Sequence, residues 1–239
     1  MRAWLGVSLA SLCFAVVGIE GCSPRAAGDE LFPLAAGAQW RYAQVTEMED
    51  QRIERRELTL RTLAPESYED ARAWRRRSDD GVDYWLRSDA SGIYRVASKN
   101  DLQAEPVRDA QPRYVLKTPI AVGTEWQATT SPYLLRRRQG FPPEVRHEHP
   151  ELPMRYSIES TADVVEVPAG RFERCVRVRG QGTLRLFVDP VAGWRDLPLV
   201  TTEWYCPGAG LVKLRREETA GSPMLLGGTL TLELQAWRP

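Results

Sequence analysis

Alternation of apolar and polar side chains is the feature that most constrains how this 239-residue chain folds. Near the end of the chain, Leu230, Leu232 and Leu234 alternate with polar residues, so the leucines occupy one face of an extended strand. The alternation recurs along the chain, at residues 57–61, 82–86, 93–96, 154–158 and 183–188. Helical periodicity is missing from windows of this length, although 65–77 could form one or two helical turns. The pattern predicts an all-β fold, a single antiparallel meander of about a dozen strands that forms an open half-barrel or a β-sandwich.

An internal repeat suggests how the strands are organised. Residues 33–40 (PLAAGAQW) return as residues 119–126 (PIAVGTEW). In each copy the proline fixes the approach of the chain, the glycine permits a positive φ, and the tryptophan is the first large side chain that a new strand buries. We interpret the repeat as a strand-entry device that could mark two halves of a sheet. One β domain over residues 32–239 is expected, because all-β folds reach this size as single units.

The N-terminus has the pattern of an export signal. Arg2 supplies a positive charge, and residues 3–19 carry no charged side chain. This run is shorter than the ~20 apolar residues of a typical membrane span, and no basic flank follows it. Residues 1–21 are therefore predicted to be a signal peptide.

The residues at the end of this signal resemble a bacterial lipobox. In Ile19–Cys22 an aliphatic and a small residue precede a cysteine, although Glu20 stands where a neutral residue is usual. The resemblance implies that Cys22 is lipidated and that residues 22–31 form a tether, so the membrane is a partner through an N-terminal lipid anchor. The alternative is that Cys22 is an incidental thiol. Ser23 favours the outer membrane of the cell envelope over the inner one.

Two cysteines remain in the body of the chain. Cys175 and Cys206 allow a single intramolecular pairing, and an exported protein meets an oxidising compartment. A disulfide between them is predicted. The alternatives are two buried free thiols or, less favoured because no CxxC pair exists, part of a metal site.

Charge and motifs exclude several function classes. Lys and Arg number 32 and Asp and Glu number 32, so no basic field favours nucleic acid. The arginine runs 75–77 and 136–138 are interpreted as solvated charges at sheet edges, with contact to anionic lipid as the alternative. The usual hydrolase, nucleotide and dinucleotide motifs do not occur, and we expect neither catalytic residues nor a cofactor.

The sequence offers one weak metal candidate. His147 and His149 would lie on one side of an extended segment, where two imidazoles could bind zinc or copper. Four prolines within residues 141–153 indicate instead an exposed loop. No metal site is therefore predicted.

Three segments resemble a known kind of protein. Phe32–Tyr42, Val167–Val178 and Glu203–Lys213 are similar to uncharacterised secreted bacterial lipoproteins. The resemblance implies an antiparallel β protein, and some members resemble the open half-barrel of the Lol-type lipoprotein carriers. It brings no catalytic residues with it.

Three functions follow as alternatives. The favoured one is a non-enzymatic lipoprotein of the bacterial cell envelope, whose β scaffold binds an apolar ligand, a lipid or a partner protein. The others are an envelope hydrolase with an active site that has no known motif, and a structural component of envelope assembly. A deep apolar cavity would favour the first, convergent histidines or carboxylates with perturbed pKa values the second, and a filled core the third.

Overall fold

The computed structural model describes residues 30–139 and 143–239, so the predicted signal peptide and Cys22 lie outside the described residues. Almost every element is a strand, and one short 3-10 helix, η1 (Val145–His147), interrupts them. The strands are β1 (Gln39–Met48), β2 (Ile53–Tyr68), β3 (Ala71–Ser78), β4 (Asp83–Asp89), β5 (Gly92–Lys99), β6 (Val107–Lys117), β7 (Glu125–Thr130), β8 (Arg136–Arg137), β9 (Leu152–Val167), β10 (Gly170–Phe187), β11 (Trp194–Cys206), β12 (Gly210–Glu218), β13 (Leu225–Leu226) and β14 (Gly228–Arg238).

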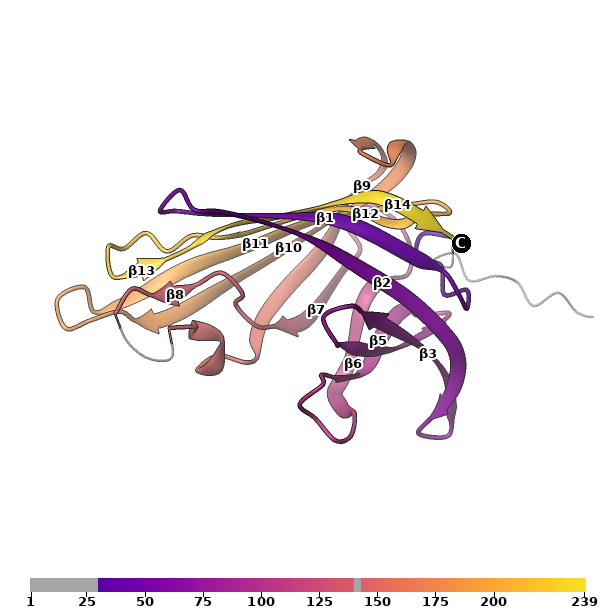
Figure 1. Ribbon diagram of the computed structural model, residues 1–239, viewed down its shortest axis with the longest axis horizontal. Helices are drawn as coiled ribbons and strands as arrows, with labels where there is room; N and C mark the ends of the chain where they lie inside the picture. Colours follow the sequence, from indigo (N-terminus) through magenta and orange to yellow (C-terminus); the bar gives the residue numbers. More distant parts are fainter. Residues whose placement is uncertain (1–29, 140–142) are drawn as a thin grey trace, which may run out of the picture.

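Twelve of the described strands form one antiparallel sheet that curls on itself (Figure 1). The order is β6-β5-β4-β3-β2-β1-β14-β12-β11-β10-β9-β7, while β8 and β13 pair separately. The sheet is nearly closed into a barrel, and one seam between the edge strands β6 and β7 stays unsealed. The predicted all-β fold is therefore confirmed, and the curvature corresponds to the half-barrel rather than the sandwich.

The sheet consists of two six-stranded meanders. Strands β1 to β6 form the first, strands β7, β9, β10, β11, β12 and β14 form the second, and β1 pairs with β14 to join them. The two copies of the sequence repeat stand at the entrance of each meander. Gly37 has φ of +87° and Gly123 has φ of +89°, and the buried Trp40 and Trp126 begin β1 and β7. The repeat is thus a strand-entry device that opens each half of the sheet.

The helical turns considered for residues 65–77 do not form, and this expectation was wrong. Residues 65–68 end β2 and residues 71–77 belong to β3, with Pro65 opposite Trp74. A bulge between Thr62 and Pro65 accommodates the proline, which has no N–H to give to the ladder. Pairing within the sheet, which a short sequence window cannot reveal, determines the structure here.

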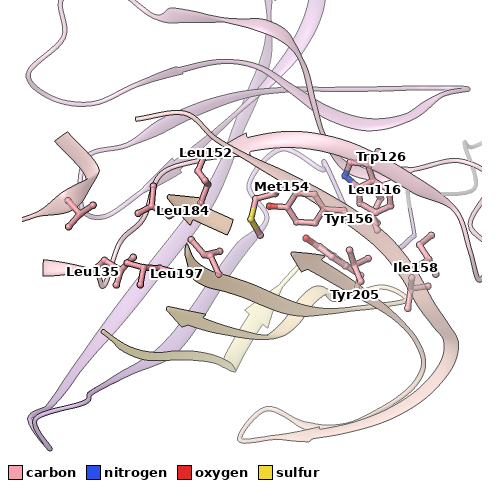
Figure 2. Packing of buried hydrophobic residues seen from close by; sticks show 14 of the residues in the cluster. Leu116, Trp126, Leu135, Leu152, Met154, Tyr156, Ile158, Leu184, Leu197 and Tyr205 are labelled. Atoms are coloured by element: carbon pink, nitrogen blue, oxygen red, sulfur yellow. The ribbon is translucent and has the colours of Figure 1, made fainter. Parts of the chain in front are cut away.

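Apolar side chains at alternating positions form the core inside the curled sheet. Over residues 152–159 of β9 the inward positions are buried and the outward ones are partly or fully exposed, as the alternation predicts. Figure 2 shows Trp126 stacked on Tyr156, with ring centroids 5.7 Å apart, and Met154 close by. Each fully buried Leu, Ile or Val side chain stabilises the fold by ~1.5–3 kcal/mol.

The predicted disulfide between Cys175 and Cys206 is present. Val176 pairs with Tyr205 across β10 and β11, so the two cysteines are the next residues opposite each other at the end of this ladder. The bond links two neighbouring strands at the point where β11 ends.

Candidate functional site: the cavity inside the curled sheet

The curled sheet encloses a cavity of about 300 Å³, which we call the interior cavity. Both meanders contribute to its wall, from β1 to β6 on one side and from β7, β9, β11 and β12 on the other. Apolar side chains form much of the wall: Phe32, Leu60, Leu86, Val115, Leu211 and Leu214. The volume lies at the lower end of the ~300–1,000 Å³ typical of small-molecule sites.

Tyrosines add hydroxyl groups to this apolar wall. The Tyr42 hydroxyl donates to the Leu211 carbonyl at 2.8 Å. Burial raises the pKa of Tyr84 to about 12, so this phenol stays protonated at neutral pH. Burial also raises the pKa of Tyr156, and Tyr205 lies beside it in Figure 2. The tyrosines are therefore neutral groups that combine an apolar ring with a hydrogen-bonding end.

Glycine at one position of β10 makes room for Tyr156. Gly180 lies opposite Tyr156 on β9 and opposite Thr201 on β11. A Cβ at position 180 would come within 2.5 Å of the Tyr156 ring and 2.4 Å of the Thr201 hydroxyl oxygen. The missing side chain thus lets the Tyr156 ring lie across β10 and face the cavity.

One carboxylate, Glu203, belongs to the cavity wall. It accepts a hydrogen bond from the Tyr205 hydroxyl two residues along β11. Burial raises its pKa, while the Tyr205 hydrogen bond and the nearby Arg113 and Arg216 oppose that rise. The protonated, neutral form of Glu203 is therefore more populated here than in water.

Two arginines of the wall are paired with carboxylates. Arg216 and the fully buried Glu218 lie 2.6 Å apart, and Glu218 also accepts the backbone N–H groups of residues 133–135. Arg95 binds Asp109 across β5 and β6, with Nε to Oδ2 at 2.8 Å. Because each cation has its own carboxylate, these pairs add little net charge to the cavity.

The other two arginines, Arg76 and Arg113, form no ion pair with any described residue. Arg76 donates from Nε to the Thr62 hydroxyl at 3.2 Å and from Nη2 to the Pro33 carbonyl at 2.6 Å. Its guanidinium carbon lies 4.2 Å from the Phe32 ring centre and 4.3 Å from that of Trp40. Burial lowers the pKa of Arg76 to about 10, which still leaves it charged at neutral pH.

Arg113 lies at the seam. It lines the interior cavity and also a second cavity of about 450 Å³, the seam cavity, between β6 and residues of β7 and β9. Burial alone would lower the pKa of Arg113, but Tyr156, Tyr133 and Glu203 raise it. The side chain is therefore a permanent cation at the boundary between the two cavities.

The metal candidate from the sequence lies outside the interior cavity. His147 is exposed in η1 rather than in an extended segment, and no group of three His, Cys, Asp or Glu that could hold a metal occurs in the part of the chain that the structure describes. Within residues 30–139 and 143–239, no helix is long and apolar enough to cross a membrane.

Sequence reasoning missed the charged residues of the cavity. Arg76 was interpreted with its neighbours as a solvated charge, yet its side chain is buried with 6% of its surface exposed. A usable signal exists in β12, where Val212, Leu214, Arg216 and Glu218 continue one alternating inward series. Charged residues at apolar positions of a strand pattern could have identified the site.

Comparisons with known proteins give similar solved structures but no family. No protein-family profile matches the chain, and no curated protein matches its sequence. Among solved structures, the chain is similar to a candidate lipoprotein from Parabacteroides distasonis, with a TM-score of 0.40 and 13% identity over 87% of this chain and 98% of that one. It is also similar to a candidate exported protein with a YmcC-like fold from Bacteroides fragilis, with a TM-score of 0.35 and 16% identity over the same shares.

Proposed function

We propose that this chain is a lipid-anchored protein of the bacterial cell envelope that binds an apolar ligand inside its β scaffold and catalyses no reaction. The observation that carries the proposal is the interior cavity, whose wall contains leucine, valine and aromatic side chains from seven strands and from the segments before β1 and after β7. Such a cavity favours ligand binding over a purely structural role, for which a filled interior is expected.

The location in the envelope is supported by the N-terminal sequence. Residues 1–21 have the signal-peptide pattern, and Ile19–Cys22 resembles a lipobox. The disulfide between Cys175 and Cys206 fits an oxidising compartment. Two or three acyl chains on Cys22 would hold the protein stably at a membrane, because a single chain binds only weakly.

Native mass spectrometry of the protein purified from its membrane tests both parts of the proposal. We expect a mass of residues 22–239 plus acyl chains, together with a second population that carries a bound lipid. The Cys22→Ser variant should lose the acyl mass and keep the bound ligand. An unmodified Cys22 in the wild-type protein would contradict the lipid anchor.

Filling the cavity tests the ligand site itself. Leu214 faces the cavity, so Leu214→Trp should remove the bound ligand from the mass spectrum. Arg215 is exposed on the same strand, and Arg215→Trp is the matched control that should retain the ligand. Equal ligand content in both variants would place any bound ligand outside the interior cavity.

One observation favours the hydrolase alternative. Burial raises the pKa of Glu203, as is common for a carboxyl group that acts as a general acid. The two functions are distinguished by incubating the ligand with the protein and determining whether the recovered ligand is intact or cleaved. A binding scaffold returns its ligand unchanged, whereas a hydrolase yields cleaved product in wild type and far less in Glu203→Gln.

A further inference from the structure

The charges around the interior cavity do not balance, and this inference about the ligand rests on the function proposed for that cavity. Four arginines and one glutamate line it. Arg95 and Arg216 are each neutralised by a carboxylate of their own. Arg76 and Arg113 remain, with Glu203 as the only other charged group of the described wall. The cavity therefore carries excess positive charge even when Glu203 is ionised, and more when it is protonated.

The structure holds one of these two cations, Arg76, in place. Two acceptors and two aromatic rings fix the Arg76 guanidinium, so little ordering is needed when a ligand arrives. Arg113 stands between the interior cavity and the seam cavity. A ligand that passed the seam between β6 and β7 would meet the Arg113 guanidinium before it reached the apolar wall beyond.

Desolvated arginines recognise carboxylates and phosphates strongly, because a guanidinium forms charge-assisted and often bidentate hydrogen bonds with them. The same site holds an apolar surface from Leu60, Leu86, Leu211 and Leu214 and the rings of the tyrosines. A fully apolar molecule would leave the excess positive charge of the cavity without a counterion, and a small free anion would leave the apolar wall uncovered.

We propose that the interior cavity binds an anionic amphiphile, with its carboxylate or phosphate end at Arg113 and Arg76 and its hydrocarbon chain against the leucines and tyrosines. Charge selects the head group, and the apolar wall selects the tail. The occupant is thus a molecule of the fatty-acid or phosphorylated-lipid class rather than a neutral hydrocarbon.

Calorimetric titration with probes that share one tail tests the head-group preference. The full protein, purified and freed of bound lipid, is titrated with decanoate, decyl phosphate, decanol and decylammonium at one ionic strength and neutral pH. We expect decanoate and decyl phosphate to bind about ten- to a hundredfold more tightly than decanol, and decylammonium to bind most weakly.

Two variants test whether Arg113 causes the preference for an anionic head group. Arg113→Met keeps an unbranched apolar side chain and removes the guanidinium, so decanoate affinity should fall toward that of decanol while decanol affinity stays unchanged. Arg155→Met is the control, because Arg155 is exposed on β9 next to Tyr156 and should retain full discrimination. The wild-type probe series decides the question even where Arg113→Met does not fold.

The outcomes separate this inference from the function on which it rests. Equal affinity for decanoate and decanol would overturn the anionic head group and leave ligand binding in place. Inorganic phosphate that binds as tightly as decyl phosphate would mark a free-anion site and overturn the role of the tail. Binding of none of the four decyl probes would overturn both the inference and the proposed function.

Discussion

Gly180 determines how the Tyr156 ring reaches the cavity, because any side chain at position 180 meets that ring. Gly180 pairs with Tyr156 on β9 and with Thr201 on β11, and the side chains of these two residues occupy the space that a Cβ atom would need. At the residue scale, the shape of the cavity wall therefore depends on a glycine in the middle of β10.

The Gly180→Ala variant should lose ~1–3 kcal/mol of unfolding free energy, because the added methyl group forces Tyr156 and Thr201 to shift in a packed interior. Denaturant unfolding measures this loss. Gln181→Ala, at the exposed neighbouring position, is the control and should stay close to wild type. Wild-type stability in Gly180→Ala would show that the ring can move without cost.

Glu203 should give the protein a pH-dependent stability. Its folded-state pKa is raised above the ordinary value of 4.5 by burial, so its contribution is fully present below pH 4.5 and is lost as the pH rises through the folded-state pKa. Relative to Glu203→Gln, the wild-type protein should become less stable on going from pH 4 to pH 8. Unfolding curves over this range give the difference in unfolding free energy between the two proteins. The other carboxyl groups titrate in both proteins, so their effect cancels in this difference. A difference that stays constant with pH would contradict the raised pKa.

At the scale of elements, the disulfide fixes one end of the β10–β11 ladder. Cys175 and Cys206 are 31 residues apart in sequence, so the bond restricts the unfolded chain considerably. The bonded pair also lies where β10 continues beyond the end of β11 to pair with β9 alone.

Replacement of both cysteines by alanine should lower the unfolding free energy by ~3–4 kcal/mol on the chain-entropy model. Chemical denaturation of the double variant and of wild type measures this. Addition of reductant should bring wild type toward the variant and leave the variant unchanged. A double variant as stable as oxidised wild type would contradict the expectation.

Strand positions and the disulfide could be predicted from the sequence because both depend on local patterns: alternation for Leu230, Leu232 and Leu234, and cysteine number for Cys175 and Cys206. Closure of the sheet could not be predicted, because the pairing of β1 with β14 joins residues from opposite ends of the described chain. The charged residues of the cavity were missed for a related reason. Arg76 and Glu203 lie in an ordinary polar context in sequence and become neighbours of one cavity only through the fold.

At the scale of the whole molecule, the seam is the weak line of the sheet. Strands β6 and β7 each have one partner in the sheet, whereas the ten strands between them have two. The seam cavity also separates these edges, so fewer contacts hold them closed.

Amide hydrogen exchange should therefore be faster in residues 107–117 and 125–130 than in the paired segment 194–206 of β11. Exchange followed by mass spectrometry measures this directly. Decanoate at saturation should slow exchange in β6, since the occupied cavity includes Arg113. Equal protection of β6, β7 and β11 without ligand would contradict an unsealed seam.

The pairing of the first strand with the last has a consequence for the order of folding. Strand β1 can complete its hairpin with β2 as soon as these neighbouring segments meet, but its other edge must wait for β14 from the far end of the sequence. Until then the first meander is a sheet with two open edges, each able to template aggregation. Completion of the sheet thus requires a contact between the two ends of the described chain, and we expect such non-local pairing to slow folding.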